Sequence, residues 1–251
     1  MGSITEKIRK NKWFLALKRR GGELFDLSDL KIIEPPEGYY MADPFLLDDF
    51  VFYELYDYDK GVIAYSVINK DLTLSKPKIV LDMPFHLSFP CLFQDGENVY
   101  MTPEQGMSGR LEIYKAMNFP DKWEPICLVD TGSFADPVLY YNGYYYSIYA
   151  TDSDNRKVIY RSDKINGEWL KIASVEEVHP RSAGQIFKYN GLDIRPVQEI
   201  IPQYGRAIHF KDLLKGNIIK SIEPDWLPGL TGTHTFSFNE KFVVIDGKLP
   251  L

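Results

Sequence analysis

One strand–turn–strand unit recurs five times along this chain, and the repeat restricts the possible folds more than any other feature. The clearest copy runs from Phe134 to Tyr149, where two apolar and aromatic segments flank Asn142-Gly143 and the pair Asp136-Pro137 stands near the start. Asn-Gly between two such segments predicts a hairpin with a type I′ turn, because both central residues of that turn need positive φ.

The other four copies have the same length and the same order of parts. They are residues 42–54, 88–101, 182–194 and 233–245. With Pro44, Pro90, Pro137, Gly184 and Thr235 taken as equivalent, the steps between copies are 46, 47, 47 and 51 residues. Sheet-forming units at this period predict a β-propeller with one four-stranded blade per repeat. The sequence therefore predicts an all-β, five-bladed β-propeller that forms a single domain over residues 13–251, after an N-terminal tail of residues 1–12.

The fifth unit lacks outer strands of its own, because little sequence follows residue 245. Two short strand-like segments near the start, Trp13 to Leu17 and Leu30 to Ile33, are available to supply them. Closing the ring removes unpaired sheet edges. We therefore expect residues 13–35 to complete the last blade.

Bulk composition excludes several classes of partner. The net charge of −6 gives no reason to expect a nucleic-acid partner. No apolar run reaches the ~18 residues of a membrane helix, so no membrane span is expected. The four histidines do not show metal-ligand spacing, and we expect neither a metal nor another cofactor. A soluble cytoplasmic protein is the resulting expectation.

The hairpin pattern also predicts where chemistry can occur. In an antiparallel hairpin the start of the first strand lies beside the end of the second, so five radial hairpins bring these positions to one end of the propeller. Acidic, basic and amide side chains gather at those positions, whereas the opposite end holds turn residues. The candidates are Asp43, Glu54, His86, Glu104, Asp136, His179, Arg181, Arg195, Gln198, Tyr204, Arg206 and His234.

Two or three carboxylates that converge on one site are what glycoside cleavage requires, since one group protonates the leaving oxygen and another attacks the sugar or activates water. A structural explanation exists for each carboxylate alone, because Asp before Pro is a common turn starter. Asp43 and Asp136 at equivalent places in the repeat, with Glu104 nearby, favour a function.

Several segments together resemble the N-terminal propeller domain of glucosamine inositolphosphorylceramide transferases and its bacterial relatives. They are residues 40–46, 86–90, 100–104, 179–184, 194–198 and 232–235, and the resemblance covers about residues 13–247. That domain is similar in turn to five-bladed propeller glycosidases of the arabinanase and β-xylosidase type.

In those glycosidases an Asp base opens blade one, an Asp that tunes pKa values lies in blade two and a Glu acid lies in blade three. Only the first residue matches here, at Asp43. Blade two opens with Phe89-Pro90, and blade three offers Asp136 where the glycosidases have Glu. The resemblance thus implies a carbohydrate-related site without transferring the glycosidase mechanism intact.

Two classes of function follow. In the first, the chain is a carbohydrate-active enzyme that hydrolyses or transfers a glycosyl unit from a saccharide or nucleotide-sugar. Asp43 is then base or nucleophile, Glu104 the acid and Asp136 a pKa tuner or a sugar ligand, and the remaining candidates bind substrate. In the second, the chain is a non-catalytic glycan-binding or scaffold propeller that works beside a partner transferase chain.

Overall fold

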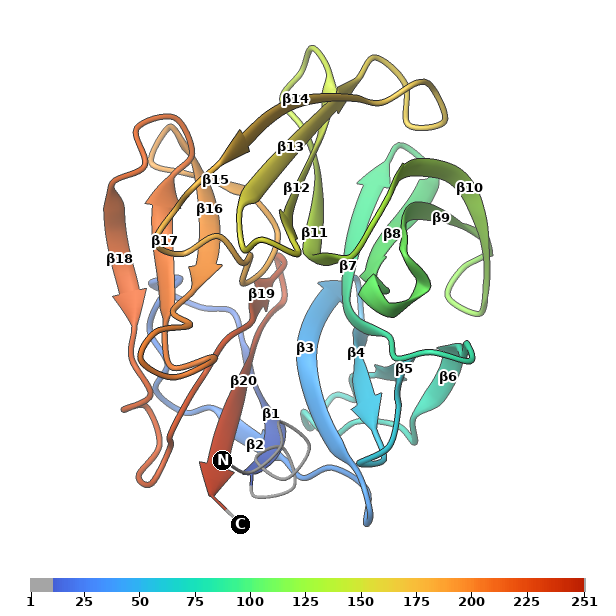
Figure 1. The fold of residues 1–251 in the computed structure, drawn as a ribbon. Coiled ribbons are helices and arrows are strands. Elements are labelled where there is room, and N and C mark those ends of the chain that lie inside the picture. Colours follow the sequence, from blue (N-terminus) through green and yellow to red (C-terminus); the bar gives the residue numbers. More distant parts are fainter. Residues whose placement is uncertain (1–10, 251) are drawn as a thin grey trace, which may run out of the picture.

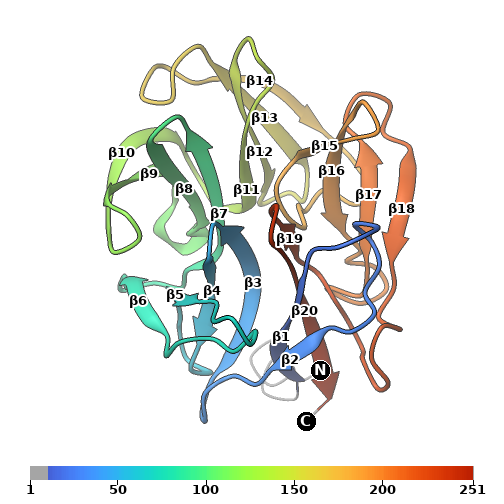
Figure 2. The ribbon, with the colours of Figure 1, turned by 180° about the vertical axis from the view of Figure 1, so that it is seen from behind.

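The computed structural model describes residues 11–250, so the expected tail at residues 1–12 lies almost wholly outside the described residues. Five sheets of four antiparallel strands fan around a common centre (Figures 1 and 2). The all-β, five-bladed propeller predicted from the repeat is confirmed. The one helix among these residues is the short 3-10 turn η1 (Gly106–Ser108). No helix within 11–250 has the length and hydrophobicity that crossing a bilayer would need.

The first four blades follow the chain order. Blade one contains β3 (Tyr40–Leu47), β4 (Phe50–Tyr56), β5 (Gly61–Val67) and β6 (Lys78–Leu81); blade two contains β7 (Ser88–Asp95), β8 (Asn98–Glu104), β9 (Arg110–Asn118) and β10 (Lys122–Thr131). Blade three contains β11 (Phe134–Tyr141), β12 (Tyr146–Asp152), β13 (Lys157–Ser162) and β14 (Leu170–Val175); blade four contains β15 (Phe187–Tyr189), β16 (Leu192–Gln198), β17 (Ile208–Asp212) and β18 (Ile218–Ile222).

Blade five is built from both ends of the chain, as predicted. Its strand order is β19 (Phe236–Phe238), β20 (Phe242–Pro250), β1 (Asn11–Arg19) and β2 (Lys31–Ile33). Strand β1 pairs with β20 over its whole length, from Asn11 opposite Pro250 to Arg19 opposite Phe242. In Figure 1 the blue N-terminal strand accordingly lies beside the red C-terminal one. The pairing closes the ring and covers the edge of β20.

Burial explains why the inner strands read as continuous apolar runs. All residues of β3 except the last are buried, because neighbouring blades cover both faces of the inner strands. Phe45 of β3 meets Phe89 of β7 edge-on, with ring centroids 4.9 Å apart, and both side chains are fully buried. The outer strand β14 is mostly exposed. The core therefore lies between blades rather than within one of them.

Turn chemistry differs from the expectation at one hairpin. At Asn190-Gly191 both residues have positive φ, 49° and 78°, as a type I′ turn requires. At Asn142-Gly143 only Gly143 has positive φ, so the predicted type I′ turn is wrong there. Asn142 Oδ1 instead accepts the N–H groups of Tyr144 and Tyr145 at 2.9 and 3.1 Å, an Asx turn that lengthens the loop.

Gly184 lies where blade four meets blade five, and the close approach gives a stability prediction. Its φ is +144°, and an added Cβ would lie 2.2 Å from the Phe236 carbonyl oxygen. Gly184→Ala is expected to lower the free energy of unfolding by about 3 kcal/mol, because the clash adds to the backbone strain. Gly143→Ala is a matched control with positive φ and open space around the new Cβ, and it should cost only about 1 kcal/mol. Equal urea midpoints for the two variants would contradict this account.

Candidate functional site at the propeller mouth

The first strands of blades one to three share a β-bulge that sets the direction of one side chain. Asp43, Phe89 and Asp136 have positive φ values of 53°, 47° and 46°, each precedes a proline, and the strand register shifts at each. Asp tolerates this conformation, whereas for a bulky Phe it is an outlier. Blades one and three therefore present a carboxylate at this position, and blade two presents a buried ring.

The second strands add carboxylates at the same end. Glu54 lies opposite Ala42 and Glu104 lies opposite Ser88, in the register position just before the bulge in each blade. These two carboxylates, the two aspartates of the bulges and five further side chains from blades four and five form what we call the mouth cluster. Its members are Asp43, Glu54, Glu104, Asp136, Arg181, Gln198, Tyr204, His234 and Asp246.

One half of the mouth cluster is centred on Asp246 of β20, a fully buried carboxylate. Asp246 accepts four hydrogen bonds: its Oδ1 from the backbone N–H groups of His234 and Thr235, its Oδ2 from the backbone N–H of Asp43 and from His234 Nδ1 at 2.6 Å. Asp43 Oδ1 accepts a hydrogen bond from the Thr235 hydroxyl at 2.6 Å and lies 3.8 Å from His234 Nδ1. Asp246 therefore fixes both His234 and the backbone that carries Asp43.

The other half is centred on the guanidinium of Arg181, which contacts two carboxylates. Its Nε and Nη2 donate to Asp136, and Nη2 also donates to Glu104 Oε2 at 3.0 Å. The backbone N–H of Asp136 donates to the same Glu104 oxygen at 3.0 Å. Gln198 Nε2 donates to Asp136 Oδ2 at 3.1 Å. Asp136 is thus held by three N–H donors and serves to position Arg181.

Tyr204 connects the two halves at the rim. The Arg181 guanidinium lies 5.1 Å from the centre of its ring, and the ring meets His234 edge-on with centroids 5.6 Å apart. His234 also stacks on Trp13, with ring centroids 4.0 Å apart and an interplanar angle of 18°. Tyr204 is 45% exposed, so the rim offers an aromatic surface to solvent.

The charges of the mouth cluster shift the pKa values of its acids and of His234. Burial raises the pKa of Asp136 to about 7, with Arg181 acting in the opposite direction and Glu104 in the same one. Burial likewise raises the pKa of Asp43, against the effect of His234, and the nearby charges of Glu54 and Asp136 add to the rise. Burial lowers the pKa of His234, but Asp246 and Asp43 outweigh it and raise that pKa to about 9. Titratable groups in the neutral range are typical of functional sites.

Three carboxylate oxygens in the mouth cluster remain available to a ligand. Among residues 11–250, Asp43 Oδ2, Glu54 Oε2 and Glu104 Oε1 accept no hydrogen bond, whereas the other oxygen of each side chain is held. The Glu104 side chain is 21% exposed, and those of Asp43 and Glu54 are 7% and 6% exposed. These three acids, rather than Asp136 or Asp246, can therefore exchange protons with a bound molecule.

Other predicted site residues lie at the edge of the mouth cluster or outside it. His86 accepts the Gly61 N–H at Nδ1, and its Nε2 lies 3.2 Å from Glu54 Oε1, so it holds Glu54 much as Arg181 holds Glu104. Burial lowers the pKa of His86, and Glu54 outweighs that effect so that the net shift is upward.

Three predicted binding residues have their contacts elsewhere in blade four. Arg195 is buried against the Pro180 carbonyl and lies 3.5 Å from Glu177. His179 packs on the His209 ring at 4.7 Å, and Arg206 pairs with Glu199 and Glu223. Their contacts are those of structural residues, and a role in substrate binding stays a prediction.

Asp246 was missed by the sequence analysis. It directly follows the apolar run Phe242–Ile245, where the sequence alone would end the second strand of the fifth hairpin, although β20 continues to Pro250. Applying to the last blade the strand-end rule that identified Glu54 and Glu104 would have found it. Trp13 and Lys248 were missed too, since their approach to the mouth depends on ring closure: Lys248 Nζ lies 5.1 Å from the centre of the Trp13 ring and donates to the Tyr204 carbonyl.

Asp43, His234 and Asp246 place oxygen and nitrogen atoms within 4.8 Å of one another, close enough to hold a cation. Both Asp246 oxygens are already committed to N–H donors, and His234 Nδ1 is committed to Asp246. A metal ion would have to displace these bonds. We therefore interpret the group as a hydrogen-bonded one.

Comparison with known proteins identifies the family of this chain. Residues 34–223 match the family described as glucosamine inositolphosphorylceramide transferase 1, N-terminal. The chain belongs to this family. The match includes Asp43, Glu104, Asp136 and Arg181 but ends before His234 and Asp246 of blade five.

Curated relatives of this glucosamine inositolphosphorylceramide transferase N-terminal family are much longer. The chain is 26% identical over 189 residues to glucosamine inositolphosphorylceramide transferase 1 of Arabidopsis thaliana, an alignment that covers 67% of this chain and 25% of that protein. For the protein of the same name from Oryza sativa subsp. japonica the identity is 28% over 200 residues, covering 69% and 27%. The chain thus spans about a quarter of the length of the curated relatives it matches.

Solved structures share the fold of this family member at low sequence identity. A family 117 glycoside hydrolase from the marine bacterium Zobellia galactanivorans superposes with a TM-score of 0.57 at 11% identity, covering 95% of this chain and 92% of that one. An α-L-arabinanase variant from Cellvibrio cellulosa gives a TM-score of 0.52 at 14% identity, covering 72% and 78%. The propeller fold of these glycosidases is shared, in agreement with the resemblance noted from the sequence.

Proposed function

We propose that the mouth cluster binds a saccharide and cleaves or transfers a glycosyl unit, with Asp43 and Glu104 as the reacting pair. The observation that carries the proposal is that Asp43 and Glu104 each keep one open oxygen, Asp43 Oδ2 and Glu104 Oε1, whereas both oxygens of Asp136 and of Asp246 accept hydrogen bonds. Glu54 also keeps an open oxygen, but its other oxygen is paired with His86. Membership in a transferase family and the shared glycosidase fold support a carbohydrate ligand.

The charges favour one assignment of roles. Asp43 is buried and has a raised pKa, so it holds a proton near neutral pH and can give it to the leaving oxygen. Glu104 Oε2 accepts a hydrogen bond from the Arg181 guanidinium, and its Oε1 is open. Glu104 then attacks the sugar carbon or takes a proton from the incoming water or hydroxyl. These roles reverse the assignment made from the sequence.

A saccharide would meet the mouth cluster at its rim. The exposed faces of Tyr204 and Glu104 lie there, and an aromatic ring beside charged groups is a suitable surface for a sugar. The His234 imidazolium and Arg181 would donate hydrogen bonds to sugar hydroxyls or to a donor phosphate.

The test is product formation from a panel of aryl glycosides, oligosaccharides and nucleotide-sugars. Asp43→Asn and Glu104→Gln should each lower turnover at least about a hundredfold, the range expected for loss of general acid or base catalysis. An aryl glycoside with a good leaving group should restore turnover to Asp43→Asn but not to Glu104→Gln, because only the acid becomes dispensable. Glu97→Gln, on an exposed turn of blade two, is the control.

A second candidate is a glycan-binding or scaffold propeller that acts beside a separate transferase. Two observations favour it: Arg181 neutralises the Glu104–Asp136 pair, and the chain spans only a quarter of its curated relatives. In that case Asp43→Asn changes the affinity for a saccharide, and no member of the panel yields a product with the wild-type protein. Turnover that survives both substitutions would overturn the proposed roles.

A further inference from the structure

A second candidate site lies at the end of the propeller opposite the mouth cluster. A cavity of about 440 Å³ opens between blades three and four, at the hairpin turns. Blade three contributes Tyr140, Tyr145 and Arg161 to its walls, and blade four contributes Asp193 and the turn of residues 212–215. Asp136 begins the strand that ends at this cavity, so the two sites are separated by about 13 Å of strand.

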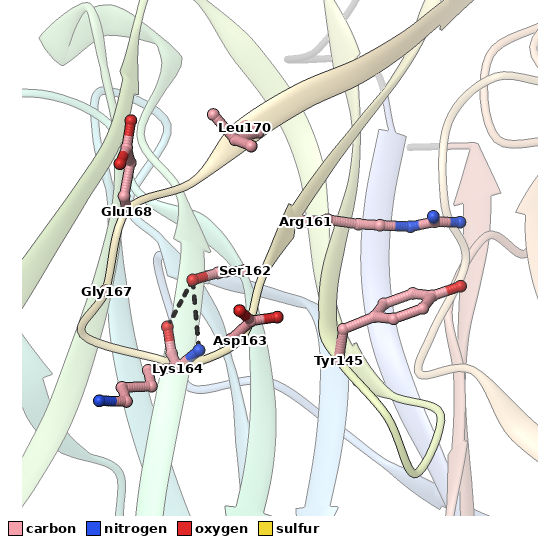
Figure 3. A pocket seen from close by; sticks show the side chains of 8 residues that line it. All are labelled: Tyr145, Arg161, Ser162, Asp163, Lys164, Gly167, Glu168 and Leu170. Carbon is pink, nitrogen blue, oxygen red and sulfur yellow. Dashed lines mark hydrogen bonds between the residues drawn. The ribbon is translucent and has the colours of Figure 1, made fainter.

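The cation in the cavity wall has no acidic partner. The Arg161 guanidinium lies 4.1 Å from the centre of the Tyr145 ring and forms no ion pair among residues 11–250. Figure 3 shows Arg161 over Tyr145, both extending away from Lys164 and Glu168; all four also line a neighbouring cavity of about 390 Å³. A guanidinium stacked on an aromatic ring is pre-oriented for a carboxylate or phosphate.

The acids of the same cavity are already occupied. Asp193 pairs with Lys188 at 2.8 Å, and Asp212 Oδ1 accepts the backbone N–H groups of Leu214 and Lys215 at 2.9 and 3.0 Å. Lys215, also in the lining, forms no ion pair with any residue the structure describes. The uncompensated charge that faces a ligand here is therefore positive.

Tyr140 adds a neutral hydroxyl group to the cavity wall. The residue is 9% exposed, and its buried hydroxyl lies beside the Asp193 carboxylate. Burial and the interaction with Asp193 both raise its pKa, so the hydroxyl keeps its proton.

We propose that this cavity, which we call the turn-end pocket, binds a sugar that carries a carboxylate or a phosphate group. The Tyr145 and Tyr149 rings offer apolar surface to a sugar ring, Tyr140 and Ser147 offer hydroxyl groups, and Arg161 takes the anionic group. The pocket volume lies in the range of sites that hold small ligands. The inference is independent of the reaction proposed for the mouth cluster.

The probes are glucose 6-phosphate and glucuronic acid, with glucose and inorganic phosphate as comparison ligands, followed by calorimetry and by amide chemical shifts. We expect one or both anionic sugars to bind at least about tenfold more tightly than glucose or phosphate, with shifts confined to the turns of blades three and four. Arg161→Gln should weaken that binding about tenfold, and Tyr140→Phe should weaken it to a smaller degree. Arg110→Gln, which removes a half-exposed arginine of blade two, should leave it unchanged.

Several results would overturn the proposal. They are no binding of either anionic sugar at millimolar concentration, equal binding of glucose, or full affinity in Arg161→Gln. Loss of binding in Asp43→Asn with no change in Arg161→Gln would place the ligand at the mouth cluster instead. Because the readout is binding at the turns, it is separable from turnover at the mouth, and failure of one proposal leaves the other standing.

Discussion

Asp246→Ala is expected to lower the free energy of unfolding by about 4 kcal/mol at pH 6, because it removes the acceptor of four buried hydrogen bonds. Three backbone N–H groups, of Asp43, His234 and Thr235, lose their partner, and the His234 imidazolium is left in a buried site without its counter-ion. Removing one partner of a buried pair typically costs about 3–5 kcal/mol.

The loss of stability in Asp246→Ala should depend on pH, and the titration of His234 sets the direction of that dependence. The folded-state pKa of His234 is raised from 6.5 to about 9, so the stability it contributes is fully present below pH 6.5 and is lost as pH rises through 9. The difference between wild type and Asp246→Ala should therefore be largest near pH 6 and should shrink by about 3 kcal/mol toward pH 9. The part of the stability cost that comes from the unsatisfied N–H groups should not change with pH.

Urea unfolding at pH 6, 7.5 and 9 measures this prediction. Asp246→Asn keeps one acceptor oxygen and should cost about half as much, whereas Asp95→Ala, which removes an exposed carboxylate with a single hydrogen bond from Tyr146, should cost less than about 1 kcal/mol. A cost for Asp246→Ala that is independent of pH would show that Asp246 does not hold His234 in its charged form.

Arg181→Gln is expected to have the opposite pH dependence. The pKa of Asp136 is raised from 3.8 to about 7 in the folded state, so the stability it contributes is fully present below about pH 4 and falls as pH rises through 7. Arg181 is the group that limits this rise, and its removal raises the pKa of Asp136 further. In the variant, the free energy of unfolding therefore continues to fall as the pH rises above 7.

The cost of Arg181→Gln should accordingly be small near pH 4.5 and reach about 4 kcal/mol at pH 8, where Asp136 must either take up a proton or stay charged without Arg181 beside it. Urea midpoints at the two pH values give the difference. Lys122→Gln breaks an exposed pair with Glu124 and should change stability by less than about 1 kcal/mol at either pH. A larger loss of stability at pH 4.5 than at pH 8 would contradict the view that Arg181 compensates the carboxylates of Asp136 and Glu104.

The blade count and the ring closure could be predicted from the sequence because each hairpin is local. Turn residues and alternating strand segments report contacts between neighbours in the chain, and the steps between copies then reveal the repeat. Closure by residues 13–35 followed from the missing strands of the fifth copy. The turn at Asn142 was the exception, since its Asx hydrogen bonds compete with the type I′ geometry.

The sequence could predict which end of the propeller the candidate residues occupy, but not how far each of them lies from the propeller axis. Strand starts and ends place a residue at the mouth end, and Asp43, Glu104, Asp136 and His234 do meet there. Arg206 lies at the same end but just before β17, one strand further out, where it pairs with Glu199 and Glu223. The strand-end rule would place Asp246 at the mouth end, but its hydrogen bond from the Asp43 backbone joins residues more than two hundred positions apart, which no local pattern reports.

The pairing of β1 with β20 has a consequence for how the molecule can be re-engineered. Asn11 and Pro250 face each other across one antiparallel ladder, so a short turn between them would make an ordinary hairpin. The polypeptide could then be circularly permuted by opening it in the exposed segment after Arg19. If the native molecule were pulled at Asn11 and Pro250, the hydrogen bonds between β1 and β20 would break one after another. The ring would then open at blade five before the force reached the other four blades.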